Sequence, residues 1–173
     1  MKKIIVLLLC LGVVLQAQIL ISPIDAMKES FGSGATISKK NILISNAKYK
    51  EVQKNAQLKL DTKIYRIFSA KKDDKVLGYG ILVSRKVRSK NAVVLYIIEN
   101  EKLKSMDVIA FNEPLEYVPS KTWQEQFNNT QTTNYLQLNR EIPTITGATL
   151  SARSITDGSR VAFSLYNTLL KDK

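Results

Sequence analysis

The stretch from Thr62 to Phe111 constrains the fold more than any other part of the chain. In four segments, β-branched and aromatic residues recur with a period of two, which is typical of half-buried strands. These segments are KIYRIFSA, VLGYGILVSRKV, NAVVLYIIE and KLKSMDVIAF. The connections KKDDK, RSK and ENEK are short enough to be hairpin turns. The sequence therefore predicts an antiparallel meander with one face covered by helices.

Further elements are predicted before this meander. Ser22 is a typical N-cap ahead of Pro23, and Gly32 stands where that helix would end. The segment ATISKKNILIS then predicts a strand. The segment NAKYKEVQKNAQ, which begins at Asn46, predicts a short polar helix.

The clearest helix lies at the C-terminal end. Before it, two prolines break the sheet, a short helix is expected from Ser120, and residues 128–144 are polar and predict an exposed irregular segment. From Ser151 to Leu170, one helical face collects the apolar side chains Ile155, Ala162, Leu165, Tyr166 and Leu169. The expected fold class is α+β, a central antiparallel sheet with N-terminal and C-terminal helices.

Residues 1–17 have the features of a signal peptide. A basic MKK precedes the apolar stretch IIVLLLCLGVVL, and QAQ offers a cleavage site after Ala17. We therefore expect an exported, periplasmic protein with one domain spanning residues 18–173. An uncleaved leader that anchors this domain to the membrane is the alternative, although the apolar stretch is short for a bilayer span.

Composition narrows the chemistry available to this domain. Loss of Lys2 and Lys3 with the leader lowers the formal net charge from +11 to +9. This surplus favours anionic partners, or is simply a lysine-rich soluble surface; nucleic acid is not expected, because the basic residues are scattered. The chain has no His, and its single Cys lies in the leader. The domain therefore lacks the residues for a Ser-His-Asp triad or a Cys-ligated metal, so redox chemistry would require a bound organic cofactor.

Two similar phrases place small residues beside hydroxyls. GSGATISKK, from Gly32, reads as a helix stop followed by a strand, whereas TITGATLSARSITDGSR leads into the C-terminal helix. Thr149 and Ser151 are therefore expected at a helix N-terminus, whose free N–H groups and positive dipole end suit a phosphate. Gly147 and Ala148 allow a ligand to approach the backbone closely. An ordinary N-cap at Thr149 or Ser151 is the alternative that needs no ligand.

The segment ITGATLSARSITDGSR resembles the attachment motif of FMN-binding domains, Ser/Thr-Gly-Ala-Thr before a helix. Such domains occur in the G subunit of the Rnf electron-transport complex, the C subunit of the sodium-translocating NADH:quinone reductase, nitrous-oxide-respiration regulators and small exported flavoproteins. GYGILV, FNEPLEYVP and TWQEQF are similar to the exported members. In that family the last threonine of the motif carries FMN through a phosphoester bond made by a flavin transferase. The resemblance implies this role for Thr149, with the cofactor-binding neighbours Thr146, Gly147, Ala148, Leu150 and Ser151.

The resemblance also implies a wall for the flavin in the segment NEPLEY. Glu113 would face the flavin from this loop, and Tyr117 offers a ring for stacking. The alternative is a rigid connector packed on the sheet. Tyr79, between Gly78 and Gly80, is a further candidate, unless these glycines only relieve crowding against a helix.

One position departs from the family motif. Three residues before Thr146 the family has an Asp, whereas this chain has Pro143, and the nearest acid is Glu141.

The sequence leaves three hypotheses for the function. The first is an exported flavoprotein with FMN esterified to Thr149 that exchanges electrons with a redox protein or a membrane respiratory complex. The second is a module that binds FMN or another phosphate compound without a bond, and the third is a cofactor-free assembly factor of a respiratory complex.

Overall fold

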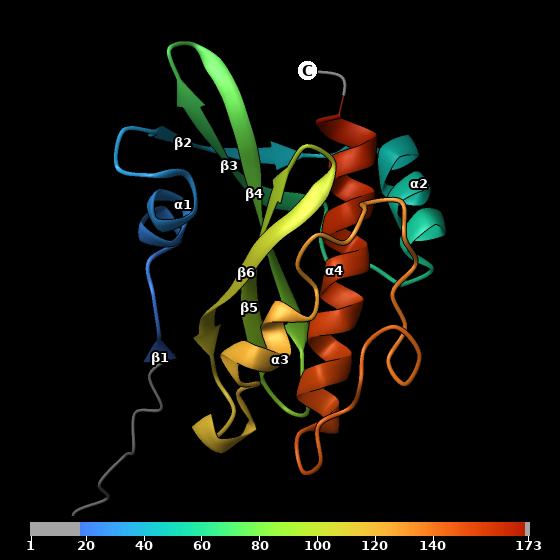
Figure 1. The fold of residues 1–173 in the computed structure, drawn as a ribbon. Helices are drawn as coiled ribbons and strands as arrows, with labels where there is room; N and C mark the ends of the chain where they lie inside the picture. Colours follow the sequence, from blue (N-terminus) through green and yellow to red (C-terminus); the bar gives the residue numbers. More distant parts are fainter. Residues whose placement is uncertain (1–17, 172–173) are drawn as a thin grey trace, which may run out of the picture.

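A six-stranded antiparallel sheet forms the centre of the domain (Figure 1). The structure is a computed structural model that describes residues 18–171, so the predicted leader lies outside it. In chain order the elements are β1 (Gln18–Ile19), α1 (Pro23–Phe31), β2 (Thr36–Leu43), α2 (Asn46–Ala56), β3 (Ile64–Lys72), β4 (Lys75–Lys86), β5 (Asn91–Glu99), β6 (Lys102–Phe111), the 3-10 turn η1 (Leu115–Tyr117), α3 (Lys121–Glu125) and α4 (Thr149–Leu169).

The predicted meander is confirmed, and with it the α+β class. The strands lie in the order β1-β6-β5-β4-β3-β2, so that β2 to β6 follow one another as antiparallel neighbours. Asp73–Asp74 and Asn100–Glu101 have positive φ at both positions, as in the type I′ turns that match the twist of a hairpin. The short strand β1, which the sequence did not predict, pairs with the edge of β6.

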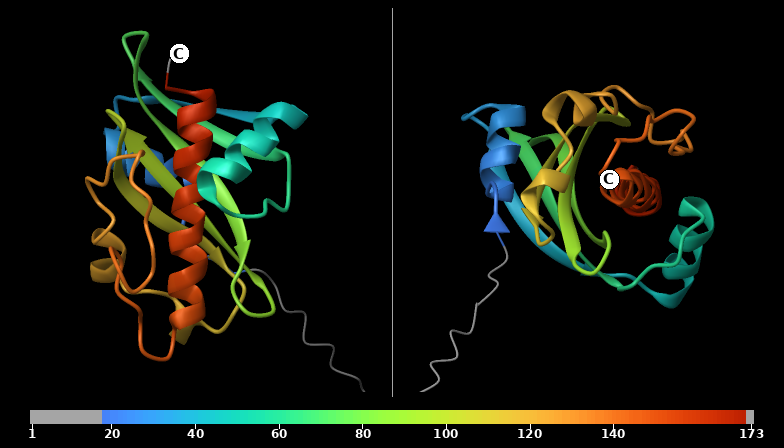
Figure 2. Two further views of the ribbon diagram at one scale, coloured as in Figure 1. Left: turned by 90° about the vertical axis from the view of Figure 1, so that its right-hand side faces the viewer. Right: turned by 90° about the horizontal axis from the view of Figure 1, so that it is seen from below.

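Helices cover both faces of the sheet, where the sequence predicted only one covered face. Figure 2 shows α1 on one side of the strands and α4 with α2 on the other. On the α1 side, Met27 packs in a cluster with Phe68 and Leu95. A Cβ at Gly80 would overlap the Met27 side chain, so glycine here relieves crowding against a helix. Strand β5 is consequently buried along most of its length instead of alternating.

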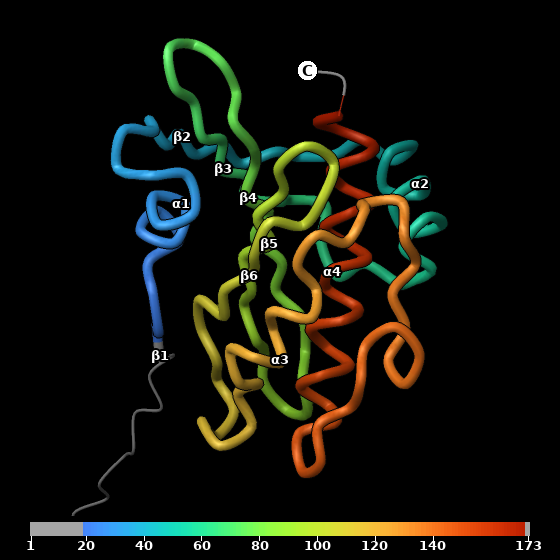
Figure 3. The backbone as a smooth tube through the Cα atoms, viewed as in Figure 1, coloured from blue at the N-terminus to red at the C-terminus, as the bar shows by residue number. Residues whose placement is uncertain are grey.

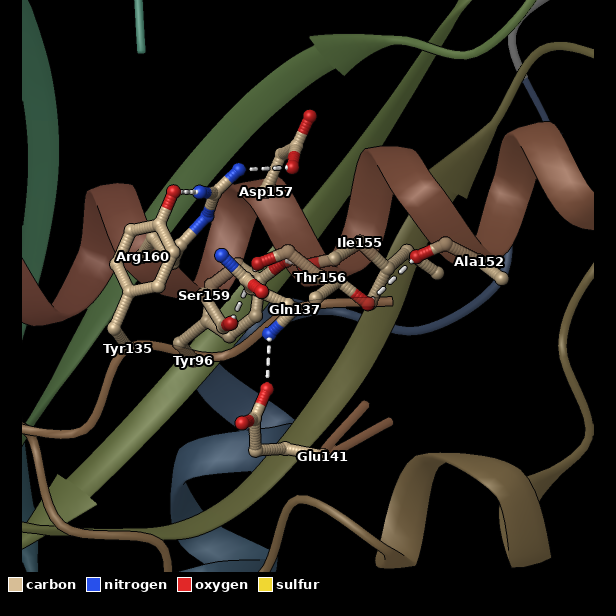
Figure 4. A network of polar contacts seen from close by, with 10 residues as sticks. All are labelled: Tyr96, Tyr135, Gln137, Glu141, Ala152, Ile155, Thr156, Asp157, Ser159 and Arg160. Carbon is tan, nitrogen blue, oxygen red and sulfur yellow. Dashed lines mark hydrogen bonds and ion pairs between the residues drawn. The ribbon is translucent and has the colours of Figure 1, made fainter. Parts of the chain in front are cut away.

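Helix α4 crosses the opposite face and is buried on several sides. Its predicted apolar face is buried as expected, and so are many of its small polar residues. The sheet, α2 and the irregular segment after α3 surround it (Figure 3). The hydroxyl of Thr156 donates to Ala152 O at 2.8 Å, and that of Ser159 to Thr156 O at 2.7 Å (Figure 4). Small residues that bond to their own helix backbone therefore allow α4 to be buried all round.

Residues 128–144 are irregular, as predicted, but they are less exposed than the sequence suggested. Leu136 and Ile142 are buried in the core. The Arg160 guanidinium of α4 donates to the Tyr135 hydroxyl and lies 4.6 Å from the centre of the Tyr135 ring. The apolar anchors of this segment are isolated among polar residues, so they form no periodic pattern that the sequence analysis would detect. Within residues 18–171, no helix has the length and apolar character to cross a bilayer.

Tyr96, in strand β5, sets how closely α4 approaches the sheet. Its ring is buried, and its hydroxyl donates to Ile155 O of α4 at 2.7 Å. Burial raises the pKa of Tyr96, so the hydroxyl keeps the proton that it donates. Gly158 lies over this hydroxyl, and a Cβ at Gly158 would overlap it. The contact therefore requires a glycine in the helix and a tyrosine in the strand.

We expect Gly158→Ala to lower the free energy of unfolding by up to about 2 kcal/mol. Overpacking of a core contact costs about 1–3 kcal/mol, of which the better helix propensity of alanine recovers about 1 kcal/mol. The same substitution in a Tyr96→Phe background should cost less, because the overlapping oxygen is gone. Urea denaturation measures both costs, with Gly34→Ala as the control because nothing lies within 4 Å of a Cβ there. Equal costs in the two backgrounds would show that this oxygen is not the obstacle.

Candidate functional site

The predicted start of the C-terminal helix borders an open cavity of about 240 Å³. Three segments form it: the β4–β5 connection, the chain after β6 and the turn into α4, all at the lower end of the molecule in Figure 1. Seven of the nine sequence-predicted site residues line it, namely Glu113, Tyr117, Gly147, Ala148, Thr149, Leu150 and Ser151. The fold therefore brings the NEPLEY segment and the TGAT segment together, although they lie far apart in the sequence.

The other two predicted residues do not line this cavity. The Tyr79 ring lies 6.1 Å from the ring of Tyr166, near the opposite end of α4. At 1.5 Å per residue, Tyr166 stands about 25 Å along the helix from Thr149, so the structure does not bring Tyr79 to the site. The glycines beside Tyr79 accommodate α1 on the opposite face instead. Thr146 is exposed in the turn before α4, outside the residues that line the cavity.

A tight turn leads the chain into α4. The Ala148 N–H donates to Ile145 O at 3.1 Å, and Gly147 has a φ of +81°. A positive φ at the third position is typical of a type II turn, which favours glycine. No atom lies within 4 Å of a Cβ built at Gly147, so the backbone conformation, rather than crowding, favours glycine here.

Helix α4 begins without a side-chain cap. Its N-cap residue is Ala148, which has no group to accept a hydrogen bond. The alternative that Thr149 or Ser151 is an ordinary N-cap is wrong, because both lie inside the helix, and the Thr149 hydroxyl donates back to Ile145 O at 3.2 Å. The first turn of α4 thus presents N–H groups and the positive end of the helix dipole beside the cavity. Serine caps the three preceding α-helices, at Ser22, Ser45 and Ser120.

Ser151 adds a buried hydroxyl that has no partner. Its side chain is 1% exposed and lines the cavity, yet its Oγ makes no hydrogen bond. The buried hydroxyls of Thr156, Ser159 and Ser164 further along α4 all donate to carbonyl groups. An unpaired buried hydroxyl costs about 1–3 kcal/mol. The Ser151 hydroxyl therefore indicates a position where a ligand oxygen or an ordered water would be bound.

Glu113 holds the β4–β5 connection on the other side of the cavity. Its Oε1 accepts hydrogen bonds from the N–H of Ser89 at 2.6 Å, of Lys90 at 2.7 Å and of Arg88 at 3.3 Å. These bonds, the one from Lys90 first, lower the pKa of Glu113 below its ordinary value of 4.5. The resemblance to FMN-binding domains implied that Glu113 faces the flavin. The structure shows its carboxylate bound to the backbone of residues 88–90, which holds the Arg88 backbone beside the cavity.

Arg88 is the one cation among the residues that line the cavity, and sequence analysis did not select it. It is exposed, and its guanidinium makes no ion pair with any acid of residues 18–171. Its only signal in the sequence is the basic run KVRSK, which reads equally well as a solvated turn. The cavity therefore combines a cation, an uncapped helix start and an unpaired hydroxyl, all of which suit an anion.

Comparisons with known proteins do not assign a function: the family models that were searched give no match, and neither do the curated proteins. In the described part of the chain, His, Cys, Asp and Glu residues form no group of three or more that would hold a metal ion. The chemistry of the cavity therefore carries the functional argument.

We expect Ser151→Ala to raise the free energy of unfolding of the ligand-free protein by about 1 kcal/mol, because it removes an unpaired buried hydroxyl. Urea denaturation in phosphate-free buffer measures this change. Ser159→Ala is the matched control, and it should lower stability by about 1 kcal/mol because its hydroxyl is bonded. If the two variants lose stability alike, the Ser151 hydroxyl has a partner within the protein.

Because the pKa of Glu113 is lowered, the stability that its hydrogen bonds to residues 88–90 contribute depends on pH. Its contribution is complete above the ordinary pKa of 4.5 and is lost as pH falls through the lowered folded value. The wild-type protein should therefore exceed Glu113→Gln in stability by a constant amount above about pH 5.5, and this excess should shrink with further acidification. Denaturation across pH measures it, with Glu116→Gln as a control for removal of an exposed charge nearby. If this excess does not change with pH, the ionised Glu113 carboxylate does not stabilise the fold through these hydrogen bonds.

Proposed function

We propose that this protein is an exported electron carrier that holds FMN, with the flavin phosphate at the start of α4 and esterified to Thr149. The observation that carries this proposal is the unpaired, buried hydroxyl of Ser151 beside a helix start that has no cap. Hydrogen-bond donors that converge without an acceptor suit phosphate oxygens. The resemblance of ITGATLSARSITDGSR to an FMN attachment motif suggests the identity of the ligand.

The residues around the cavity fit this ligand. The first N–H groups of α4, the Ser151 hydroxyl and the Arg88 guanidinium are all hydrogen-bond donors, and phosphate oxygens are acceptors. Val87, Tyr117 and Leu150 supply apolar surface for a flat ring. When bound, FMN would supply the reversible electron transfer that no side chain of this domain offers.

The size of the cavity supports a carrier rather than a closed enzyme site. Its volume of about 240 Å³ lies below the roughly 300–1,000 Å³ of pockets that enclose a whole ligand. A flavin held here by its phosphate would keep much of its surface open to solvent, where a second redox protein can approach. The donor and acceptor in this proposal are a redox protein or a membrane respiratory complex in the periplasm.

Thr149 is the hydroxyl that a modifying enzyme can reach, because Thr149 is exposed whereas Ser151 is buried. The proposed bond joins Thr149 Oγ1 to phosphorus. It requires a flavin transferase and a flavin donor of the phosphoanhydride class. The threonine oxygen loses its proton to a base of the transferase and bonds to the flavin-side phosphorus, while the anhydride bond breaks and the other phosphate half leaves as a phosphomonoester.

A second candidate is a module that holds FMN without a bond. Pro143 occupies the position of the motif acid, and its carbonyl accepts a hydrogen bond from Trp123 Nε1 at 2.8 Å. The carboxylate of Glu141 accepts the Gln137 N–H at 2.9 Å (Figure 4). Neither residue offers a free acid where the transferase motif has one. Dialysis under denaturing conditions separates the candidates, since only an esterified flavin stays with the chain.

The ester predicts a flavin that survives denaturation. Protein coexpressed with a flavin transferase should gain the mass of one FMN group and keep the flavin absorbance in denaturant. Thr149→Ala should lose both and remain folded, because its side chain is exposed at a helix start. Thr133→Ala is the matched control, an exposed threonine outside both the motif and the cavity, and it should stay loaded. An unmodified wild-type mass, or flavin retained by Thr149→Ala, would contradict the ester.

A further inference from the structure

We infer that Arg88, held in place by Glu113, makes this cavity select phosphorylated flavins over the uncharged flavin before any bond to Thr149 forms. The inference rests on the proposed function in that the ligand is a flavin. It is independent of the ester, since it concerns recognition by groups that surround the cavity. Neither Arg88 nor this role of Glu113 follows from the attachment motif.

Several hydrogen bonds hold the backbone of the turn that carries Arg88. Besides three backbone N–H groups, Glu113 Oε1 accepts from the Ser89 hydroxyl at 3.2 Å. The Val87 N–H donates to Lys90 O at 2.8 Å and closes the connection from inside. The Glu113 carboxylate therefore ties this turn to the segment after β6 that carries Tyr117.

Arg88 is the arginine that is placed to meet a ligand of this cavity. Arg160 of α4 is engaged by Asp157 and by Tyr135. Arg153 is exposed one turn after Thr149, but it does not line the cavity. The guanidinium of Arg88 has no acid partner within residues 18–171. An anion in the cavity is therefore the partner that this cation fits.

The same groups would reject a flavin that lacks a phosphate. Riboflavin offers one neutral hydroxyl oxygen in place of the charged phosphate oxygens, so most of these donors stay unpaired and Arg88 gains no ion pair. A site built to hydrogen-bond a polar group discriminates strongly against an analogue that lacks it. FMN, and not riboflavin, is therefore the expected ligand of the unmodified chain.

The test uses the mature chain purified from a host without flavin transferase. Quenching of flavin fluorescence gives the dissociation constants of FMN and of riboflavin for each variant. We expect the wild-type protein to bind FMN at least tenfold more tightly than riboflavin. Arg88→Ala should weaken FMN binding about tenfold, as expected for loss of one charge-assisted hydrogen bond, and leave riboflavin binding unchanged. Arg153→Ala removes the same charge outside the cavity and should have little effect.

Two substitutions at Glu113 separate positioning from charge. Glu113→Gln keeps an oxygen that accepts the turn's N–H groups but removes the negative charge, so FMN should bind as tightly as before or more tightly. Glu113→Ala releases the turn and should weaken FMN binding severalfold. In an Arg88→Ala background the effect of Glu113→Ala should disappear, because there is no guanidinium left to position.

The inference is overturned if Arg88→Ala keeps the wild-type preference for FMN over riboflavin, or if Arg153→Ala lowers FMN affinity equally. Tighter FMN binding by Glu113→Ala would also overturn it, because Glu113 would then only repel the phosphate. Failure of the wild-type chain to prefer FMN would end it as well. These outcomes differ from failure of the ester, which the mass of transferase-treated protein reports separately.

Discussion

The close contact between α4 and strand β5 is the constraint on which the rest of the structure depends. Tyr96 reaches from the centre of the sheet to the Ile155 carbonyl, and Gly158 leaves room for its hydroxyl. A long helix held this close runs along β4 and β5, and its first turn lies at an end of these strands. The position of the cavity follows from this packing, because the β4–β5 connection and the chain after β6 lie at that same end.

The entry into α4 is fixed separately from its middle. Trp123 is buried and donates to Pro143 O, which holds the chain shortly before the turn at Gly147. Leu136 and Ile142 anchor the irregular segment that leads there. The exposed turn residues thus sit on a supported backbone. A binding element built from a turn and a helix start keeps its shape only when the chain before it is restrained in this way.

The periodic pattern of apolar residues made most of the fold predictable from the sequence. Contacts between segments that are distant in sequence leave no such pattern. The period of two in NAVVLYIIE predicted a strand, but not that α1 would cover its second face, because a buried run and a half-buried run differ little over nine residues. The TGAT motif placed the turn and helix start correctly. Arg88 was missed because its role depends on Glu113, which lies more than twenty residues away in sequence and reaches the connection only in the folded chain.

The helix start itself argues for a ligand on energetic grounds. Replacing a good N-cap by alanine costs about 1 kcal/mol, and an unpaired buried hydroxyl costs about 1–3 kcal/mol. Both costs fall on the same turn of α4, at Ala148 and Ser151, whereas the three other α-helices within residues 18–171 each begin with a serine cap. An alanine at position 151 would remove the second cost, whereas Ala148 is itself buried at the helix start. A bound anion offsets them together, because it accepts from the free N–H groups and from the Ser151 hydroxyl. Anion binding therefore stabilises the folded protein, and it does so by removing the unfavourable contributions at the start of α4.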